Sequence, residues 1–168
     1  SGLVGSEMCI RDRFNSNLSI VKSVIKSNQN RKMLLTKRVL KIMNNKIKNK
    51  KIAVLGVTFK ANTDDMRESS SLVLIPYLLK KGAKISYHDP SGPKKEFNKK
   101  KNLNFVSSIN KACIGADLII INTEWDEFKS IDFRKVVKKS NFKIYDMRNL
   151  YNPKELKKRN IKYYSVGR

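Results

Sequence analysis

The sequence has few of the residues on which metal, disulfide or general-base chemistry depends. It contains two cysteines, Cys9 and Cys113, and a single histidine, His88, in 168 residues. The cysteines are too far apart for a metal-ligand spacing or a disulfide framework, so we interpret both as free thiols and predict no metal site. His88 ends a predicted strand, and we interpret it as structural because we expect no second ligand or acid–base group nearby.

Long hydrophobic runs are also absent. No stretch approaches the roughly eighteen consecutive apolar residues of a membrane-spanning helix, and the opening SGLVGSEMCIRDR lacks the apolar centre of a signal peptide. We therefore expect a cytoplasmic protein with no membrane partner. Residues 1–14 show no helical or strand periodicity and resemble a translated adapter sequence, so this leader is excluded from the predicted fold.

Acidic residues are scarce: 14 stand against 37 basic residues, which gives a formal net charge of +23. A basic surface is the electrostatic footprint of a nucleic-acid-binding protein. Most of these basic residues are lysines scattered over many segments, however, and no nucleic-acid motif accompanies them. Asparagine and isoleucine are abundant too, as a low-GC coding bias produces. We predict no nucleic-acid partner, although the lysines can draw polyanionic ligands.

The segment richest in chemistry is KIAVLGVTFKANTDDMRE, residues 51–68. The apolar run 52–55 is typical of a parallel strand covered on both faces. A polar loop follows it, and ligands of open α/β sheets bind beyond the carboxyl ends of strands. The Gly-x-Gly-x-x-Gly fingerprint is absent, because Gly56 has no partner glycine in the next turn. The sequence therefore argues against a self-sufficient dinucleotide site of the usual kind.

Strand and helix patterns alternate after residue 51. Apolar runs predict strands at 52–55, 84–88, 117–122, 142–145 and 162–166, and amphipathic spacing predicts helices at 69–81, 108–115, 132–139 and 153–159. The charged residues 94–102 are interpreted as a loop or short helix. This alternation predicts an α/β fold with a doubly wound, mostly parallel, Rossmann-like sheet, with the very apolar 117–122 at its centre. Ser69 to Ser71 are predicted N-cap hydroxyls, and Pro76 should bend its helix unless the helix starts later.

A long helix is predicted before the sheet, over residues 15–44, with a break near residues 27–30. Its apolar residues lie along one side of the helix. Within this chain, only the sheet domain itself or another subunit offers cover for that stripe. We interpret it as a linking or dimer-forming helix in preference to a simple surface helix.

Three motifs in register carry a resemblance to a known family. GVTFKANTDDMRESSSLVLIPYLLKKGAKISYHDP, GADLIIINTEWDEF and YDMRN resemble the C-terminal domain of the UDP-glucose/GDP-mannose dehydrogenase family, over residues 51–167. The form NTDDMRE leans toward the UDP-glucose branch. The resemblance implies residues 15–50 as the end of a central dimerisation helix with its linker, and residues 51–168 as a UDP-sugar-binding domain of a homodimer.

The family oxidises the primary alcohol of a sugar nucleotide to a carboxylate with NAD, in two steps. The resemblance implies a separate NAD-binding domain and a catalytic cysteine in a Gly-Gly-Ser-Cys-Phe-Pro-Lys type motif. Cys113 lies in ACIGADLI and does not match that motif, and Cys9 lies in the leader. We therefore expect a fragment, inactive by itself, of an NAD-dependent enzyme that converts UDP-glucose to UDP-glucuronate.

Four site residues follow from the same resemblance. Phe59, Lys60 and Arg148 match positions that bind the UDP-sugar, and Arg67 matches an arginine that reaches NAD. Two cations beyond two strand ends can converge on a diphosphate. The alternatives are a solvated surface lysine for Lys60 and ion pairs for the arginines, with Asp64, Asp65 or Glu68 for Arg67 and with Asp146 for Arg148.

Two other functions stay open. One is a GDP-mannose or UDP-N-acetylhexosamine dehydrogenase of the same family. The other is a non-catalytic module that binds nucleotides or nucleic acid by itself.

Overall fold

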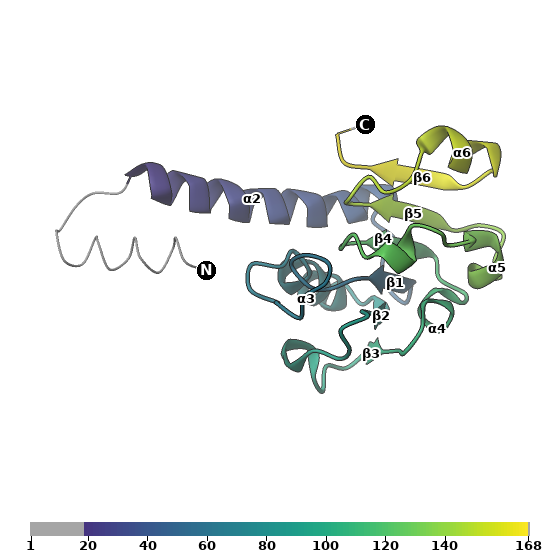
Figure 1. The fold of residues 1–168 in the computed structure, drawn as a ribbon, viewed down its shortest axis with the longest axis horizontal. Coiled ribbons are helices and arrows are strands. Elements are labelled where there is room, and N and C mark those ends of the chain that lie inside the picture. The colour runs from purple at the N-terminus through teal and green to yellow at the C-terminus, as the bar shows by residue number, and fades with distance from the viewer. Residues whose placement is uncertain (1–18, 168) are drawn as a thin grey trace.

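The computed structural model describes residues 19–167 (Figure 1). The predicted leader, Cys9 and the predicted helix start at residues 15–18 lie outside the described residues. The strands are β1 (Lys51–Leu55), β2 (Lys84–His88), β3 (Leu103–Phe105), β4 (Leu118–Ile121), β5 (Lys143–Asp146) and β6 (Lys162–Ser165). The helices are α2 (Ser19–Ile42), α3 (Ser71–Lys80), α4 (Ile109–Cys113), α5 (Phe133–Val137) and α6 (Pro153–Lys158), with short 3-10 turns η1 (Lys95–Phe97) and η2 (Asp126–Phe128).

All five strand pairings are parallel, and the strand order is β3-β2-β1-β4-β5-β6. The order reverses between β1 and β4, which makes this pair the topological switch point of a doubly wound sheet. The predicted fold class is confirmed. The predicted central position of residues 117–122 is confirmed as well, because β4 lies between β1 and β5 with every residue buried.

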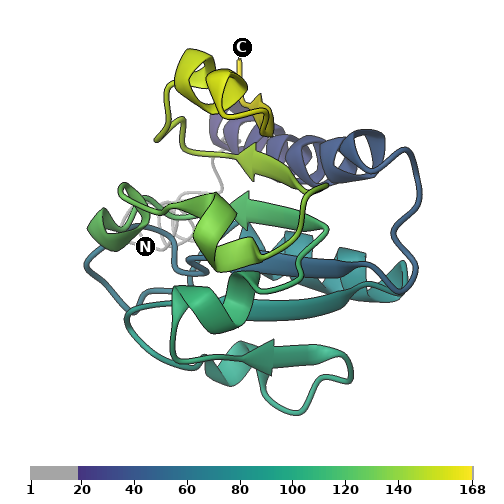
Figure 2. The ribbon, with the colours of Figure 1, turned by 90° about the vertical axis from the view of Figure 1, so that its right-hand side faces the viewer.

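The two faces of the sheet bury two separate clusters, and β1 alternates between them. Ile52 and Val54 pack with α2 and α3 on one face, whereas Ala53 and Leu55 pack with α4, α5 and α6 on the other. Figure 2 shows the sheet between these layers. Burial on both faces explains why these strands read as continuous apolar runs and not as alternating ones.

Helix α2 runs without interruption, so the predicted break near residues 27–30 is wrong. Its C-terminal half buries Thr36, Val39 and Ile42 against the sheet domain. Its N-terminal half extends past the sheet (Figure 1) and leaves Ile20 78% exposed and Val24 54% exposed. The predicted apolar stripe is therefore covered along only part of its length.

Helix α3 begins later than predicted, at Ser71, and Pro76 lies inside it on the exposed side. The predicted N-cap role does not hold for Ser70, which makes no capping hydrogen bond, whereas the Ser69 hydroxyl accepts the N–H of Ser71, the first residue of the helix, at 3.2 Å. The hydroxyls of Ser69 and Ser71 donate to the Val57 carbonyl at 2.7 and 2.5 Å. The serine cluster thus fastens the loop after β1 to the start of α3.

At Gly56 the segments after β1 and β4 approach each other closely. The φ of Gly56 is +76°, and a Cβ there would lie 2.5 Å from the Cβ of Thr123. A side chain would meet both an unfavourable left-handed backbone and a buried neighbour with no room to move. Only glycine fits between these two strand ends.

We expect Gly56→Ala to lower the free energy of unfolding by about 2–5 kcal/mol, since a left-handed alanine costs about 1–2 kcal/mol and overpacking about 1–3 kcal/mol. Gly92→Ala is the matched control: its φ is +89°, but nothing lies within 4 Å of its added Cβ. The control should lose only the backbone part. Urea denaturation of both variants measures the difference, and equal losses would contradict the proposed clash.

Candidate functional site

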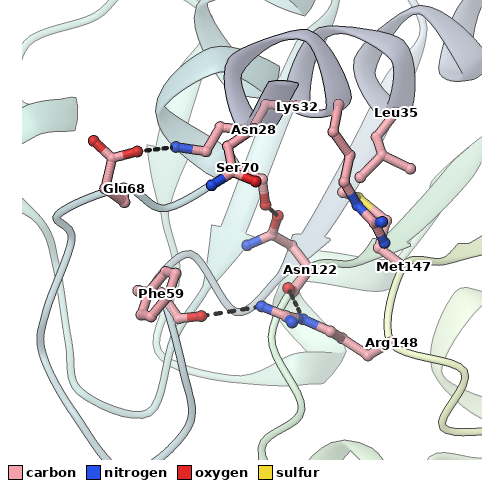
Figure 3. Close-up of a pocket in the computed structure, with 10 residues that line it drawn as sticks. Asn28, Lys32, Leu35, Phe59, Glu68, Ser70, Asn122, Met147 and Arg148 are labelled. Atoms are coloured by element: carbon pink, nitrogen blue, oxygen red, sulfur yellow. Dashed lines mark hydrogen bonds and ion pairs between the residues drawn. The ribbon is translucent and has the colours of Figure 1, made fainter. Parts of the chain in front are cut away.

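The segments that follow β1, β4 and β5 meet at the carboxyl edge of the sheet, beside the switch point. The Thr123 hydroxyl donates to the Thr58 carbonyl at 2.7 Å. Arg148, in the segment after β5, is hydrogen-bonded to both other segments. Its Nε donates to the Asn122 carbonyl at 2.8 Å and its Nη2 to the Phe59 carbonyl at 3.0 Å (Figure 3). Three loops that are far apart in the sequence therefore form one connected surface.

A buried carboxylate fixes the first of these loops. Asp89, just past the end of β2, is 1% exposed. Its Oδ2 accepts the backbone N–H of Val57 at 2.7 Å and of Thr58 at 3.2 Å, and its Oδ1 accepts the N–H of Ser91 at 3.0 Å. Because backbone N–H groups stabilise a buried carboxylate, Asp89 holds the loop after β1 in one position.

A second buried carboxylate fixes the loop after β5. Asp146 accepts the backbone N–H of Arg148 at 2.9 Å through Oδ1. Its Oδ2 accepts the Tyr163 hydroxyl at 2.9 Å and the Tyr151 N–H at 3.2 Å. The alternative of an Arg148–Asp146 ion pair is therefore wrong. The guanidinium pairs with Glu124 instead, whose Oε2 lies 2.8 Å from Nε, although the Nε–H is directed at the Asn122 carbonyl.

A pocket of about 420 Å³ opens beside these loops (Figure 3). From the sheet domain it is lined by Phe59, Glu68, Ser70, Asn122, Met147 and Arg148. Ser70 and Asn122 are joined across it by a hydrogen bond of 2.6 Å between the serine hydroxyl and the amide oxygen. A pocket at a switch point is where an open α/β sheet binds its ligand.

Helix α2 supplies the remaining side of the pocket through Asn28, Arg31, Lys32 and Leu35. These positions follow the spacing i, i+3, i+4, i+7 and so lie on one face of the helix. They continue the face that buries Thr36 and Val39 further along. None of the four was predicted as a site residue. Leu35 belongs to the predicted apolar stripe, and the helical spacing of Asn28, Arg31 and Lys32 relative to it was the available signal, but these three are polar and so fell outside the stripe.

The structure brings Phe59 and Arg148 together and leaves Lys60 apart. Phe59 lines the pocket with 47% of its surface exposed, and its carbonyl accepts from Arg148. Lys60, the next residue, is exposed and does not line the pocket. The site is therefore built around Phe59 and Arg148 more directly than around Lys60.

Arg67 also lies outside the pocket lining. It forms an ion pair with Asp65, which is one of the alternatives to an NAD contact. Its Nε and Nη2 donate to the two carboxylate oxygens of Asp65 at 2.9 and 2.8 Å. The hydrogen bonds from this guanidinium lower the pKa of Asp65 to about 2. Since Asp65 occupies one whole edge of Arg67 and Gly56 has no partner glycine, residues 19–167 by themselves do not fit an NAD site.

His88 has a partner that the sequence did not indicate. Its Nε2 lies 2.8 Å from Glu127 Oε1 and its Nδ1 lies 3.0 Å from the Val106 carbonyl oxygen. The expectation that no acid or base lies near it is wrong. The contact joins the end of β2 to η2.

Among residues 19–167 no group of three or more His, Cys, Asp or Glu side chains is placed to hold a metal ion. No helix in that range is long and apolar enough to span a membrane.

Comparisons with known proteins agree with this geometry. The model of the UDP-glucose/GDP-mannose dehydrogenase family, UDP binding domain, matches residues 53–153. UDP-glucose 6-dehydrogenase of Rickettsia bellii is 38% identical over 152 residues, which cover 88% of this chain and 35% of that protein. The enzyme of the same name from Rhizobium meliloti is 36% identical over 152 residues, which cover 89% of this chain and 34% of that protein.

Solved structures show the same fold. A UDP-glucose dehydrogenase from Pyrobaculum islandicum superposes with a TM-score of 0.71 at 24% identity, over 94% of this chain and 34% of that one. This chain spans about a third of the length of the curated relatives that it matches. The match over residues 53–153, together with the relatives' identity over most of the chain, shows that this chain belongs to the UDP-glucose/GDP-mannose dehydrogenase family and contains its UDP binding domain.

Proposed function

We propose that this chain is the UDP-sugar-binding part of an NAD-dependent UDP-glucose 6-dehydrogenase, which oxidises UDP-glucose to UDP-glucuronate. The observation that carries the proposal is the pocket at the switch point, lined by Phe59 and Arg148 inside the segment that matches the family's UDP binding domain. We propose residues 51–168 as the binding domain and residues 15–50 as the helix and linker that join it to the rest of the enzyme. The expectation of a cytoplasmic protein stays a prediction.

The chemistry of the pocket suits a nucleoside diphosphate. The guanidinium of Arg148 keeps Nη1 free of the contacts that hold Nε and Nη2, so it can donate to a phosphate oxygen. The exposed ring of Phe59 offers a flat apolar surface for a base or sugar. Lys60, next to Phe59 in the chain, can add positive charge to this end of the sheet domain. In the whole enzyme, Arg67 would bind NAD by breaking its ion pair with Asp65 and forming one with a phosphate of the cofactor.

The UDP-glucose branch is favoured because the named relatives at 36–38% identity are UDP-glucose 6-dehydrogenases. GDP-mannose and UDP-N-acetylhexosamine remain the second candidates, since the family model spans both kinds of base. Titration with UDP-glucose, GDP-mannose and a UDP-N-acetylhexosamine distinguishes the three: the base separates the second from the others, and the sugar separates the third from UDP-glucose.

Isothermal titration of the chain with UDP-glucose tests the binding role. Each charge-assisted contact contributes about 1.5–3 kcal/mol, so Arg148→Ala should weaken binding about tenfold to a hundredfold. Lys60→Ala should weaken it less, because Lys60 lies outside the pocket lining. In the full-length parent, neither change should alter NAD affinity, whereas Arg67→Ala should weaken NAD alone.

Arg159→Ala serves as the matched control, since this exposed arginine lies at the end of α6 and does not line the pocket. It should bind UDP-glucose as the unchanged chain does. Thermal unfolding of each variant checks that the loops tied by Arg148 remain folded. An Arg148→Ala chain that is folded and binds UDP-glucose normally would refute the assignment.

Cys113 cannot replace the catalytic cysteine that the family motif would supply. It is fully buried between α4 and the sheet, and burial raises the pKa of its thiol to about 12. At about pH 8 the reactive thiolate is therefore almost absent. These 168 residues alone should form no NADH from UDP-glucose and NAD, and iodoacetamide should leave Cys113 unmodified until the chain is denatured. Turnover by the purified chain, or alkylation of Cys113 in the native state, would overturn this.

We also propose that the N-terminal half of α2 forms the homodimer of the full-length parent, because Ile20, Val24 and Ile25 are exposed in the single chain. Val24→Glu should shift the parent toward monomer, since a charge would enter the apolar contact. Lys22→Glu, a neighbouring exposed position, is the control. Sedimentation velocity measures the oligomer, and an unchanged dimer for Val24→Glu would show that another surface is used.

A further inference from the structure

Three cationic side chains line the pocket, and two of them already have partners. The Lys32 ammonium forms an ion pair with Glu68 across the gap between α2 and the loop after β1. Arg148 donates through Nε and Nη2 to two loop carbonyls and lies against Glu124. Much of the hydrogen-bonding capacity of these two residues therefore holds the walls of the pocket in place.

Arg31 is different. It lines the pocket from α2 and is exposed, and within residues 19–167 it has no hydrogen bond or ion pair. Glu68 is the one acidic residue in the lining, and its Oε2 is bonded to Lys32. The pocket therefore keeps an excess of positive charge in this state, and the guanidinium with all its donors available belongs to Arg31.

Resting on the proposed function, we propose that Arg31 of α2 binds the diphosphate of the nucleotide sugar. A guanidinium fork presents two parallel N–H donors to a phosphate, and partly desolvated contacts of this kind are strong. Arg148 then serves in part to position the loops and in part as the opposing phosphate donor. The diphosphate would lie between one arginine from the helix and one from the loop after β5.

The helix makes Arg31 a suitable ligand because the residue sits on a rigid element. Helix α2 is continuous from Ser19 to Ile42, and the buried Thr36 and Val39 anchor it within about two turns of Arg31. The Lys32–Glu68 ion pair fixes the neighbouring residue to the sheet domain. The backbone at Arg31 is therefore already ordered, so that only the side chain loses conformational freedom when the ligand binds.

Titration of the chain with UDP and with uridine separates the phosphate contact from the rest. UDP binding is followed by calorimetry and the weaker uridine binding by ligand-observed NMR. Arg31→Ala should weaken UDP about tenfold to a hundredfold and leave uridine unchanged, because uridine has no phosphate. Arg31→Lys should recover part of the UDP affinity, since it keeps the charge and loses the fork. Lys37→Ala, an exposed α2 position outside the pocket lining, is the matched control and should change neither ligand.

The outcomes are distinguishable. If Arg31→Ala binds UDP like the unchanged chain while Arg148→Ala does not, the inference about Arg31 is overturned and the proposed function stands. An equal loss of UDP and uridine, or an equal loss in Lys37→Ala, also overturns it, because neither points to a phosphate contact. If the unchanged chain binds neither UDP nor UDP-glucose, the proposed function itself fails and the inference fails with it.

Discussion

The close approach of two strand ends at the switch point is the constraint on which the rest of the site depends. Gly56 and Thr123 follow neighbouring parallel strands and leave no room for a side chain between them. This contact lets the Thr123 hydroxyl reach the Thr58 carbonyl, and it lets Arg148 span from the third strand end to Phe59. A wider separation would break each of these bonds and open the floor of the pocket.

Two buried aspartates then turn this contact into a fixed surface. Asp89 accepts N–H groups of the loop after β1, and Asp146 accepts those of the loop after β5. Each carboxylate lies at or just past a strand end, where loop N–H groups have no strand partner. The loops are therefore ordered before a ligand binds, which lowers the entropic cost of binding. The same arrangement, used twice, explains why two loops so different in sequence present their side chains to one pocket.

Helix α2 completes the site from outside the sheet. It contributes one wall through residues on a single helical face, and the Lys32–Glu68 ion pair joins that wall to the loop after β1. The three cations of the pocket therefore have different partners. Lys32 joins α2 to the loop after β1, and Arg148 joins the loop after β5 to the loops after β1 and β4. Arg31 remains available to bind a ligand. Charge near a pocket is thus a poor guide to ligand contacts until the partners of each cation are known.

The sequence by itself determined the fold class, the positions of five of the six strands and the central place of β4, because apolar runs and the alternation of strand and helix depend on local periodicity. The edge strand β3 (Leu103–Phe105) was not predicted, because a strand of three residues is too short for a periodic pattern. It also located the loops after β1 and β5, through the polar residues that follow each strand. The tertiary structure decided which of these residues share a pocket. Lys60 is adjacent to Phe59 in the chain but outside the lining, and the Arg67 guanidinium forms an ion pair with Asp65. Arg31 enters the site across a long separation in sequence, because packing of α2 on the sheet, which no local pattern encodes, sets the direction in which its side chains point.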